Sequence, residues 1–551
     1  MQRDQQTTQR DEQTGPGPAP RSLPRWSLAI LAAIAVSVCL PAVALVVPHA
    51  SYAQDEGEGG DAEGEAPGDV PGDNGGVADA DAPARGAPAP AEHVEVASAL
   101  ASLANSWLFR KADAGLAVID LETGERVFEL GSTKLLNPAS TMKVVTSATA
   151  LKNLGPAYRF TTDLYYTGDI EPNGVLRGDL YIKGHGDPTF VSETMWKMVN
   201  DIELMGVERI DGTVYFDDTF HSGGPVLPGW DKQEDIDKGT SYFATLSALS
   251  INSNTVVLVV RPGAEVGGQA RVELETPVRG NVEIDNQVRT GPPRSRRYVD
   301  VEREVLPNED TKFTLTGSLP VDDLNRVWIR RTVADPTGHF VAVFRKQMDQ
   351  HGIRVSGGHK RRETPDDAKL LFSVRSEPLS QILASMNKSS LNFVAEQVLR
   401  TLGGEITGDG STRGGLAVVA EYLRSIGVPE ADAVLINGSG LSRQAKLKPT
   451  TLTSVLYDMA HDQKVGPEFA ASLAIAGTDG TLYSRLREDP GRLRGKTGTL
   501  DGVHCLAGFI DSHGSAATRS PSSPTTTARA CRPSETSTTP SPARCSSSAA
   551  G

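Results

Sequence analysis

The chain has 551 residues, of which 38% are hydrophobic, and its formal net charge is -14 at pH 7. This composition can bury a core, and the acidic balance excludes a protein that binds nucleic acid through its overall charge. The four cysteines and ten histidines are scattered without the spacing of a disulfide framework or a metal site, so we expect no metal and no cofactor.

Residues 1–53 have the features of an export signal. Two arginines precede an uncharged apolar run from Leu28 to Val47, and Ser51 to Ala53 form a small-residue cleavage site. The run is long enough to span a bilayer, so an uncleaved anchor is the alternative. We favour cleavage because prolines interrupt the run. The sequence therefore predicts an exported protein, periplasmic or cell-wall associated, that meets the membrane only through such an anchor.

Residues 54–93 consist mainly of Gly, Ala, Pro, Asp and Glu, with almost no aromatic side chains. Such a segment cannot bury enough apolar surface to fold, and we interpret it as a solvated linker. A helical pattern follows over residues 94–109, and two strands are predicted at residues 115–120 and 126–130. This is where the folded part of the chain is expected to begin.

The first chemical motif is Ser140-Thr-Met-Lys143. It follows Asn137-Pro-Ala, a turn and helix-start signal, and leads into an apolar run. Because residues three apart share one face of a helix, Lys143 should lie against Ser140. Ser385 and Lys388 have the same spacing, but Ser385 falls off the apolar stripe of its helix. We interpret Ser385 as an ordinary solvated serine.

Short strands and turns dominate residues 161–344, and helical patterns dominate the sequence after about residue 340. This change in pattern predicts a catalytic domain formed by residues 94–160 and 345–511. The residues between, 161–344, would be a β-rich insertion.

Two further motifs lie in the second part of the catalytic domain, Ser390-Leu-Asn392 and Lys496-Thr497-Gly498. A serine with a lysine one turn away, a Ser/Asn pair and a Lys-Thr-Gly strand are the parts of an acyl-transfer site that uses lysine to manage the nucleophile's proton. Two lysines in one pocket disfavour each other's charge, so one of them should lose its proton, and the sequence does not say which.

An alternative role exists for each of these residues. The two lysines could be ordinary surface charges, and Ser390 and Asn392 could simply start the helix predicted from Phe393. Jointly, and within their flanking sequences, these alternatives are disfavoured.

Between Leu116 and Ile510 the flanks resemble one family. The chain resembles the D-alanyl-D-alanine carboxypeptidase/endopeptidases of the low-molecular-mass class C penicillin-binding proteins, the S13 serine peptidases. The segments that carry the resemblance begin at Asn137, Leu180, Met386, Gly438, Gly480 and Gly495. It implies an α+β fold, with helices flanking an antiparallel sheet, split by an insertion of two small domains. The 250 residues between Ser140 and Ser390 are similar to the spacing in this family.

The resemblance also implies roles for the motif residues. Ser140 would be the nucleophile, with Lys143 beside it and Ser390 relaying a proton to the leaving amine. Asn392 would hold the substrate's amide. The substrate's terminal carboxylate would be held by Lys496 and Thr497, next to Gly498, and the amide hydrogens of Ser140 and Thr499 would form the oxyanion hole.

Family members also place an acid facing the stem peptide's diamino acid, and Asp217 occupies that position. A turn-forming aspartate after a strand is the alternative for Asp217. The implied partners are peptidoglycan stem peptides and β-lactam antibiotics. A serine β-lactamase or esterase on the same fold, or an inactive wall-binding protein, are the other functions that the sequence leaves open.

The C-terminus departs from the family. Residues 512–551 are low in complexity, and from Ser515 onward they contain no Ile, Leu, Val or aromatic residue. A disordered mucin-like tail is one interpretation, and a shifted reading frame is the one we favour, because the tail replaces a strand that the fold needs. We therefore expect the strand at residues 503–510 to have an unpaired edge.

Overall fold

The computed structural model describes residues 31–39, 91–230 and 238–511 of the chain. The linker, most of the export segment and the tail lie outside these residues, so the predictions made for them stay predictions. Within the described part, no helix combines the length and the apolar character needed to cross a bilayer.

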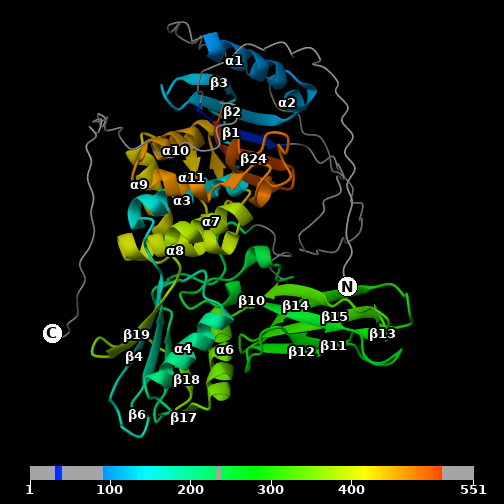
Figure 1. Cartoon of the computed structure of the whole chain (residues 1–551), viewed down its shortest axis with the longest axis vertical. Helices are drawn as coiled ribbons and strands as arrows, with labels where there is room; N and C mark the ends of the chain where they lie inside the picture. The colour runs from blue at the N-terminus through cyan, green and yellow to red at the C-terminus, as the bar shows by residue number, and fades with distance from the viewer. Residues whose placement is uncertain (1–30, 40–90, 231–237, 512–551) are drawn as a thin grey trace, which may run out of the picture. The chain divides into compact units, whose positions relative to one another are not determined.

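A six-stranded antiparallel sheet carries the Lys-Thr-Gly segment. Its strands pair in the order β22 (Ala474–Ile475), β23 (Leu493–Leu500), β24 (Val503–Asp511), β1 (Leu31–Cys39), β2 (Asp113–Asp120) and β3 (Arg126–Leu130). Helix α1 (Ala91–Ala104) contacts β3, and α10 (Pro449–His461) contacts β1 and β2 (Figure 1). The predicted α+β fold, with helices beside an antiparallel sheet, is confirmed.

The prediction of an unpaired edge beside β24 is wrong. Strand β1 pairs with β24 on one side and β2 on the other, so that Ser37 lies opposite both Cys505 and Gly115. A short apolar run suits a buried strand as well as an export segment, and periodicity alone does not distinguish the two. The strand that the tail does not supply therefore comes from the N-terminal apolar run, and cleavage after Ala53 would remove it.

Six helices pack with this sheet around one hydrophobic core. They are α10 and α3 (Met142–Leu154), α7 (Leu379–Ser389), α8 (Asn392–Thr407), α9 (Thr412–Ser425) and α11 (Gly466–Ser472). Val145 of α3, Leu383 of α7 and Val398 of α8 are all fully buried in this core. The helices predicted to open at Ser140 and at Phe393 correspond to α3 and α8, because their apolar residues recur with helical spacing.

Helix α3 lies at the centre of this core. Its residues from Met142 to Leu151 are all buried, and a short 3-10 turn, Ala139–Thr141, precedes it. The helix ends at Gly155, whose φ of +79° favours glycine. The helix that carries Lys143 is therefore held in place on every side.

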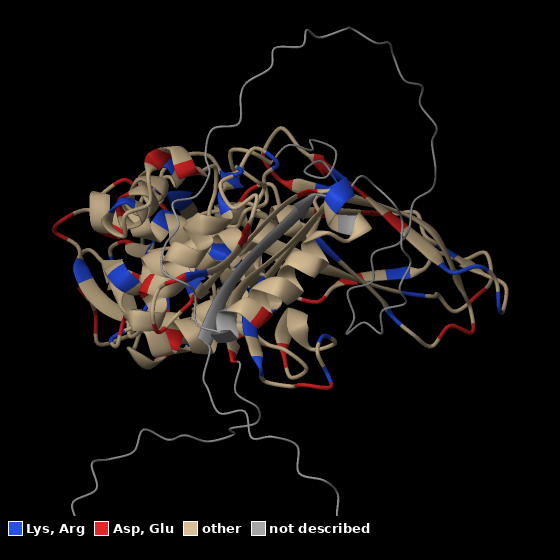
Figure 2. Ribbon diagram, turned by 90° about the horizontal axis from the view of Figure 1, so that it is seen from above, with Lys and Arg blue, Asp and Glu red and all other residues tan. Residues whose placement is uncertain are grey.

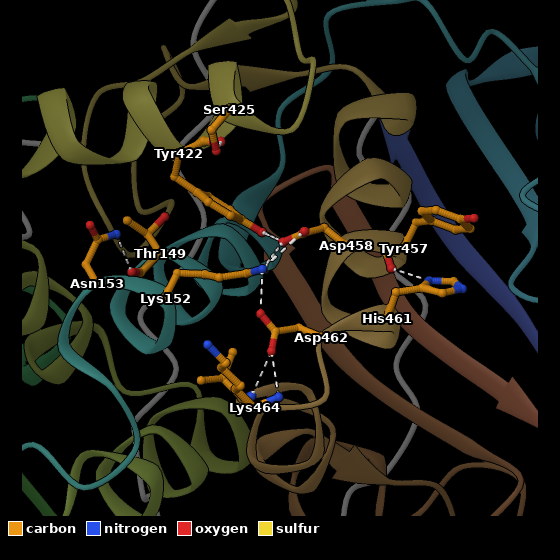
Figure 3. Close-up of polar contacts among 11 residues, drawn as sticks. Thr149, Lys152, Asn153, Tyr422, Ser425, Tyr457, Asp458, His461, Asp462 and Lys464 are labelled. Atoms are coloured by element: carbon orange, nitrogen blue, oxygen red, sulfur yellow. Dashed lines mark hydrogen bonds and ion pairs between the residues drawn. The ribbon is translucent and has the colours of Figure 1, made fainter.

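A polar cluster anchors the far end of α3 to its neighbours (Figure 3). Lys152 Nζ lies 2.6 Å from Asp462 Oδ2 and 3.1 Å from Asp458 Oδ2. The Tyr422 hydroxyl of α9 donates to the same Asp458 oxygen at 2.9 Å. Helices α3, α9 and α10 are thus linked by ion pairs as well as by apolar packing.

The inserted region, residues 161–375, contains two further cores. The first joins two sheets to α4 (Ser192–Leu204) and α6 (Pro336–His351). One sheet has the order β18 (His359–Arg361), β9 (Val214–Asp217), β7 (Leu180–Gly184), β4 (Thr161–Tyr166) and β19 (Lys369–Arg375). The other sheet has the order β17 (Arg354–Val355), β8 (Arg209–Ile210), β6 (Val175–Arg177) and β5 (Asp169–Ile170).

The second core of the inserted region lies among strands alone. One of its sheets has the order β11 (Arg271–Leu274), β10 (Thr255–Arg261) and β16 (Val327–Thr332). The other consists of β12 (Val282–Asn286), β15 (Thr311–Pro320), β13 (Arg289–Gly291) and β14 (Tyr298–Val305). Among the described residues, the positions of Lys and Arg and those of Asp and Glu are interspersed along the ribbon (Figure 2).

The strand pairings place the end of the inserted region later in the chain than residue 345, the position that the sequence predicted. Strands β17 and β18 pair with β8 and β9, and β19 pairs with β4. Residues up to Arg375 therefore lie with the inserted strands, and the chain rejoins the catalytic helices at α7. The change to a helical pattern near residue 340 misplaced the boundary because it marks α6, a helix of the inserted region.

Candidate active site

The backbone before Ser140 is tightly constrained. Asn137 Oδ1 accepts the amide hydrogen of Ala139 at 2.8 Å, and Asn137 Nδ2 donates to the carbonyl of Ser442 at 2.8 Å. Ala139 has a φ of +42°, in a region that alanine rarely adopts. Strain of this kind persists only where surrounding contacts enforce it, as at functional sites. The turn places the half-buried Ser140 in the first turn before α3.

Lys143 lies directly beside Ser140, as the spacing predicts. Its side chain is 0% exposed. Lys143 Nζ donates to Ser140 Oγ at 3.0 Å, to Asn392 Oδ1 at 2.7 Å and to the carbonyl of Ser439 at 2.8 Å. An ammonium group has three hydrogens, so these three acceptors match its full donor capacity. The group is thus fixed in one position against the serine.

A buried carboxylate holds the loop that supplies one of these acceptors. Glu396 of α8 accepts the amide hydrogens of Gly438 at 3.0 Å and Ser439 at 2.7 Å. Gly440 follows with a φ of +77°, and a Cβ there would lie 1.9 Å from the carbonyl oxygen of Ala139. The loop therefore fits closely against the turn that carries Ser140.

Ser390 and Asn392 project from the junction of α7 and α8. Ser390 ends α7 with a φ of +58°, and Asn392 is the first residue of α8. Asn392 bonds to Lys143, and its Nδ2 also donates at 3.4 Å to the carbonyl of Tyr242, a residue of the inserted region. The residue at the N-cap of α8 is Leu391. The alternative in which these two side chains merely start the helix does not describe their contacts.

Lys496 approaches the same site from the sheet. Its side chain is 0% exposed, and Nζ donates to Ser390 Oγ at 2.9 Å and to the carbonyl of Thr497 at 2.7 Å. Thr497 Oγ1 donates to Thr481 Oγ1 at 2.7 Å. The alternative in which both lysines are surface charges is wrong, because both are fully buried.

Glycine is required after Thr497. A Cβ at Gly498 would come within 3.0 Å of Ala139 Cβ and of the amide nitrogen of Ser140. The strand can therefore pack against the serine turn only without a side chain at this position. Thr499 follows at the exposed end of β23, opposite His504.

Burial changes the protonation of both lysines. Desolvation, and then the positive charge of Lys496, hold the pKa of Lys143 well below its usual value, while the nearby Glu396 acts in the opposite direction. Burial also lowers the pKa of Lys496 to about 7. Lys496 can therefore exchange a proton near neutral pH, and Lys143 gives up its proton more readily than an exposed lysine does.

Asp217 makes its contacts with residues other than those of the Ser140 site. Its carboxylate is 0% exposed and accepts the amide hydrogens of Thr219 at 3.1 Å and Thr364 at 2.8 Å. Lys183 Nζ lies 3.7 Å away. The bond to Thr219, two residues along the chain, is typical of a turn-forming aspartate, the alternative role stated above.

Sequence reasoning missed three residues that shape the site. Ser439 and Thr481 stand within segments that carry the family resemblance, and that signal could have drawn attention to them. Glu396 gave no comparable signal, because a single glutamate in an amphipathic helix is normally solvated. The buried Cys505 also lies near the site, with its thiol 3.3 Å from the carbonyl oxygen of Asn137.

This combination of fold and site defines a class of protein. A helix that begins at a serine and carries a buried lysine, with a second buried lysine on the neighbouring strand, is the arrangement of serine acyl-transfer enzymes that use lysine as the base. The chain matches the family model described as D-Ala-D-Ala carboxypeptidase 3 (S13) over residues 96–520. The protein belongs to this S13 family.

Individual relatives agree with this assignment. A D-alanyl-D-alanine carboxypeptidase of an Actinomadura species is 32% identical over 415 residues, which cover 72% of this chain and 75% of that protein. The D-alanyl-D-alanine carboxypeptidase DacB of Haemophilus influenzae is 26% identical, over 69% of this chain and 78% of the relative.

The crystal structure of penicillin binding protein 4 from Haemophilus influenzae has the same fold. It superimposes with a TM-score of 0.62 at 23% identity, covering 73% of this chain and 91% of that chain. A second structure of that protein, in complex with a β-lactam, superimposes with a TM-score of 0.57 at 22% identity and the same coverage of both chains.

Proposed function

We propose that this protein is a serine DD-peptidase that hydrolyses D-alanyl-D-alanine termini and D-alanyl cross-links of peptidoglycan through an acyl-enzyme. The observation that carries this proposal is the 3.0 Å hydrogen bond from Lys143 Nζ to Ser140 Oγ, made by a lysine whose pKa burial lowers. Membership of the S13 family and the carboxypeptidase names of the relatives supply the substrate class.

In the first step, Ser140 Oγ attacks the carbonyl carbon of the penultimate D-alanine. In neutral Lys143 a lone pair replaces the N–H that points to Ser140 Oγ, so the serine donates in this contact and its proton passes to Nζ. A free serine is too weak a nucleophile without such a base. The negative charge on the carbonyl oxygen is stabilised by the amide hydrogens of Ser140 and Thr499. Losing one such donor typically costs about 100-fold to 1000-fold in rate.

In the second step, the bond to the terminal residue breaks and its amine leaves with a proton. Ser390, which accepts a hydrogen bond from Lys496, is positioned to pass that proton. Lys496 and Thr497 hold the terminal carboxylate, and Asn392 holds the substrate's amide. Water then attacks the Ser140 ester, which releases the shortened peptide as a carboxylate and restores the hydroxyl. Asp217 has no part in this proposal, because its carboxylate is already committed to its turn.

Penicillin would acylate the same serine. The lifetime of that adduct separates a DD-peptidase from a β-lactamase or esterase on the same fold, since a peptidase releases it slowly. The purified chain should release D-alanine from a soluble peptide that ends in D-Ala-D-Ala, and its penicillin adduct should be long-lived. Rapid turnover of penicillin would favour the β-lactamase, and no release of D-alanine with no adduct would favour an inactive wall-binding protein.

We infer that the protein is exported, because its substrate is a cell-wall polymer and an apolar segment lies near its N-terminus. N-terminal sequencing of the protein recovered outside the cytoplasm is the test. A chain that begins at Gln54 would lack β1, and a chain that retains residues 31–39 would keep the sheet continuous.

A further inference from the structure

The inserted region contains a cavity with a strongly basic lining. It has a volume of about 530 Å³ and lies between the C-terminal half of α6, strands β17 and β18 and the segment before β12. Arg279, Arg345 and Arg354 line it, together with His359 and Asp349. None of these residues contributes a contact to the Ser140 site described above.

One acid only partly balances these arginines. Both carboxylate oxygens of Asp349 accept from Arg279 Nη1, at 2.7 Å and 2.8 Å. That ion pair occupies Asp349 and leaves the charges of Arg345 and Arg354 uncompensated within the cavity lining. Arginine does not lose its charge in proteins, so this excess persists at every physiological pH.

Two buried nitrogen atoms beside the cavity make no hydrogen bond in the described part of the chain. Arg345 Nε and His359 Nε2 are both buried and make no hydrogen bond to any described residue. The imidazole of His359 is held in place by Phe216 and Phe344, with ring centroids 6.2 Å from each. Burial, and then the charges of Arg345 and Arg279, lower the pKa of His359 to about 4, so the ring is neutral at pH 7. A buried polar atom without a partner is costly, so the wall behind the guanidinium groups is left electrostatically unsatisfied.

The shape of the cavity indicates what kind of anion it takes. Its volume is in the range of sites for small organic molecules and exceeds that of a lone inorganic ion. Buried Met348 and Ile353 add an apolar surface beside the guanidinium groups. A guanidinium fork matches a carboxylate in a planar, two-bond geometry. These features favour an organic molecule with an anionic group that accepts two parallel hydrogen bonds, as a carboxylate does.

We propose that this cavity, lined by Arg345, Arg354 and His359, is a second binding site for peptidoglycan, and that it binds a carboxylate of a stem peptide. The choice of stem peptide rests on the proposed function, which makes peptidoglycan the polymer that the enzyme meets. A polymer that repeats its stem peptides can occupy both sites at once. Attachment at the second site would then raise the effective concentration of peptide at Ser140.

The test measures co-sedimentation with purified peptidoglycan from which phosphate polymers have been removed. The full-length Ser140→Ala variant serves as the background, so that no substrate is consumed. In this background Arg345→Gln should weaken retention about 10-fold, the usual worth of a hydrogen bond to a charged group. Arg345→Lys, which keeps the charge without the fork, should lose less. A stem tripeptide without D-alanine should compete with the polymer for the wild-type cavity and not for the Arg345→Gln variant.

Arg271→Gln is the matched control, because Arg271 is exposed in the same inserted region and does not line the cavity. Equal retention of the Arg345→Gln and Arg271→Gln variants would overturn the proposal. Binding only to poly(glycerol phosphate), tested in parallel, would also overturn it, because the ligand would then be a phosphate polymer. Penicillin labelling is measured separately, in proteins that keep Ser140. Loss of labelling with intact retention would refute the proposed function and leave the second site standing.

Discussion

Two groups of cations in this molecule differ in residue type and in burial. Lys143 and Lys496 are each 0% exposed, and the pKa of each lies below its ordinary value. Arg345 and Arg354 line an open cavity and keep their charge. A buried lysine can give up its proton when its surroundings disfavour the charge, whereas an arginine cannot. The first group is therefore suited to proton transfer, and the second to holding an anion.

The sharpest way to break this distinction is to exchange the residue types. Lys143→Arg keeps a positive charge beside Ser140 but removes an amine that can become neutral. Acylation by penicillin should fall by about 100-fold to 10,000-fold, the usual worth of a positioned acid or base. Rates of labelling with a fluorescent penicillin measure this effect, and thermal unfolding checks that the variant is folded.

Lys388→Arg is the control for that exchange, because Lys388 belongs to the second Ser-x-x-Lys match and pairs with Asp479. It should acylate at close to the wild-type rate. If Lys143→Arg does the same, Lys143 is only an electrostatic partner and the base lies elsewhere.

The low pKa of Lys496 has a consequence for stability. The unfolded chain holds this proton up to about pH 10.5, while the folded chain loses it above about 7. Between these values the unfolded state binds more protons, so the free energy of unfolding should rise with pH. The contribution of Lys496 is about 4 to 5 kcal/mol over the whole window, since one pKa unit is worth about 1.4 kcal/mol.

Urea unfolding between pH 7 and pH 10 measures this slope. It should become shallower in Lys496→Met and stay unchanged in Lys360→Met, which removes an exposed lysine of β18. Equal slopes in wild type and Lys496→Met would mean that Lys496 keeps its proton in the folded protein.

Glu396 tests how the charge around Lys143 is set. Glu396→Gln replaces one of the two acceptor oxygens with an amide group, so a buried amide hydrogen of Gly438 or Ser439 loses its acceptor. The free energy of unfolding should fall by about 1 to 3 kcal/mol. Because Glu396 raises the pKa of Lys143, the rise of acylation rate with pH should also move to lower pH. A loss of stability with an unmoved pH profile would limit Glu396 to a structural role.

Lys152 is a third kind of cation, and its replacement should have the smallest effect on the free energy of unfolding. It is partly exposed, and although burial acts to lower its pKa, the hydrogen bonds that it donates to Asp462 and Asp458 raise that pKa. Lys152→Met should lower the free energy of unfolding by only about 1 kcal/mol, and less at high salt. Penicillin labelling should not change. A large fall in labelling would show that the cluster at the end of α3 positions Lys143.

The sequence was sufficient for the parts of the site that depend on local geometry. The spacing of Ser140 and Lys143 on one helical face predicts their contact, and the apolar stripe of α7 correctly leaves Ser385 exposed. It was not sufficient where the backbone takes an uncommon conformation. The left-handed φ of Ser390, which turns the chain between α7 and α8, has no signal in the residue itself.

Long-range pairing was the other limit. An apolar run without charges fits an export signal and a central strand equally well, so β1 could not be distinguished from a signal peptide by pattern. The arginines of the cavity come from positions 279, 345 and 354, and only the fold brings them together.

Peptide mapping after penicillin labelling tests the central claim most directly. The claim is that Ser140, beside a lysine with a lowered pKa, is the residue that becomes acylated. The label should be recovered on the peptide that contains Ser140, and Ser140→Ala should abolish it while Ser385→Ala leaves it intact. Recovery of the label on the peptide that contains Ser385, or persistent labelling of Ser140→Ala, would contradict the account.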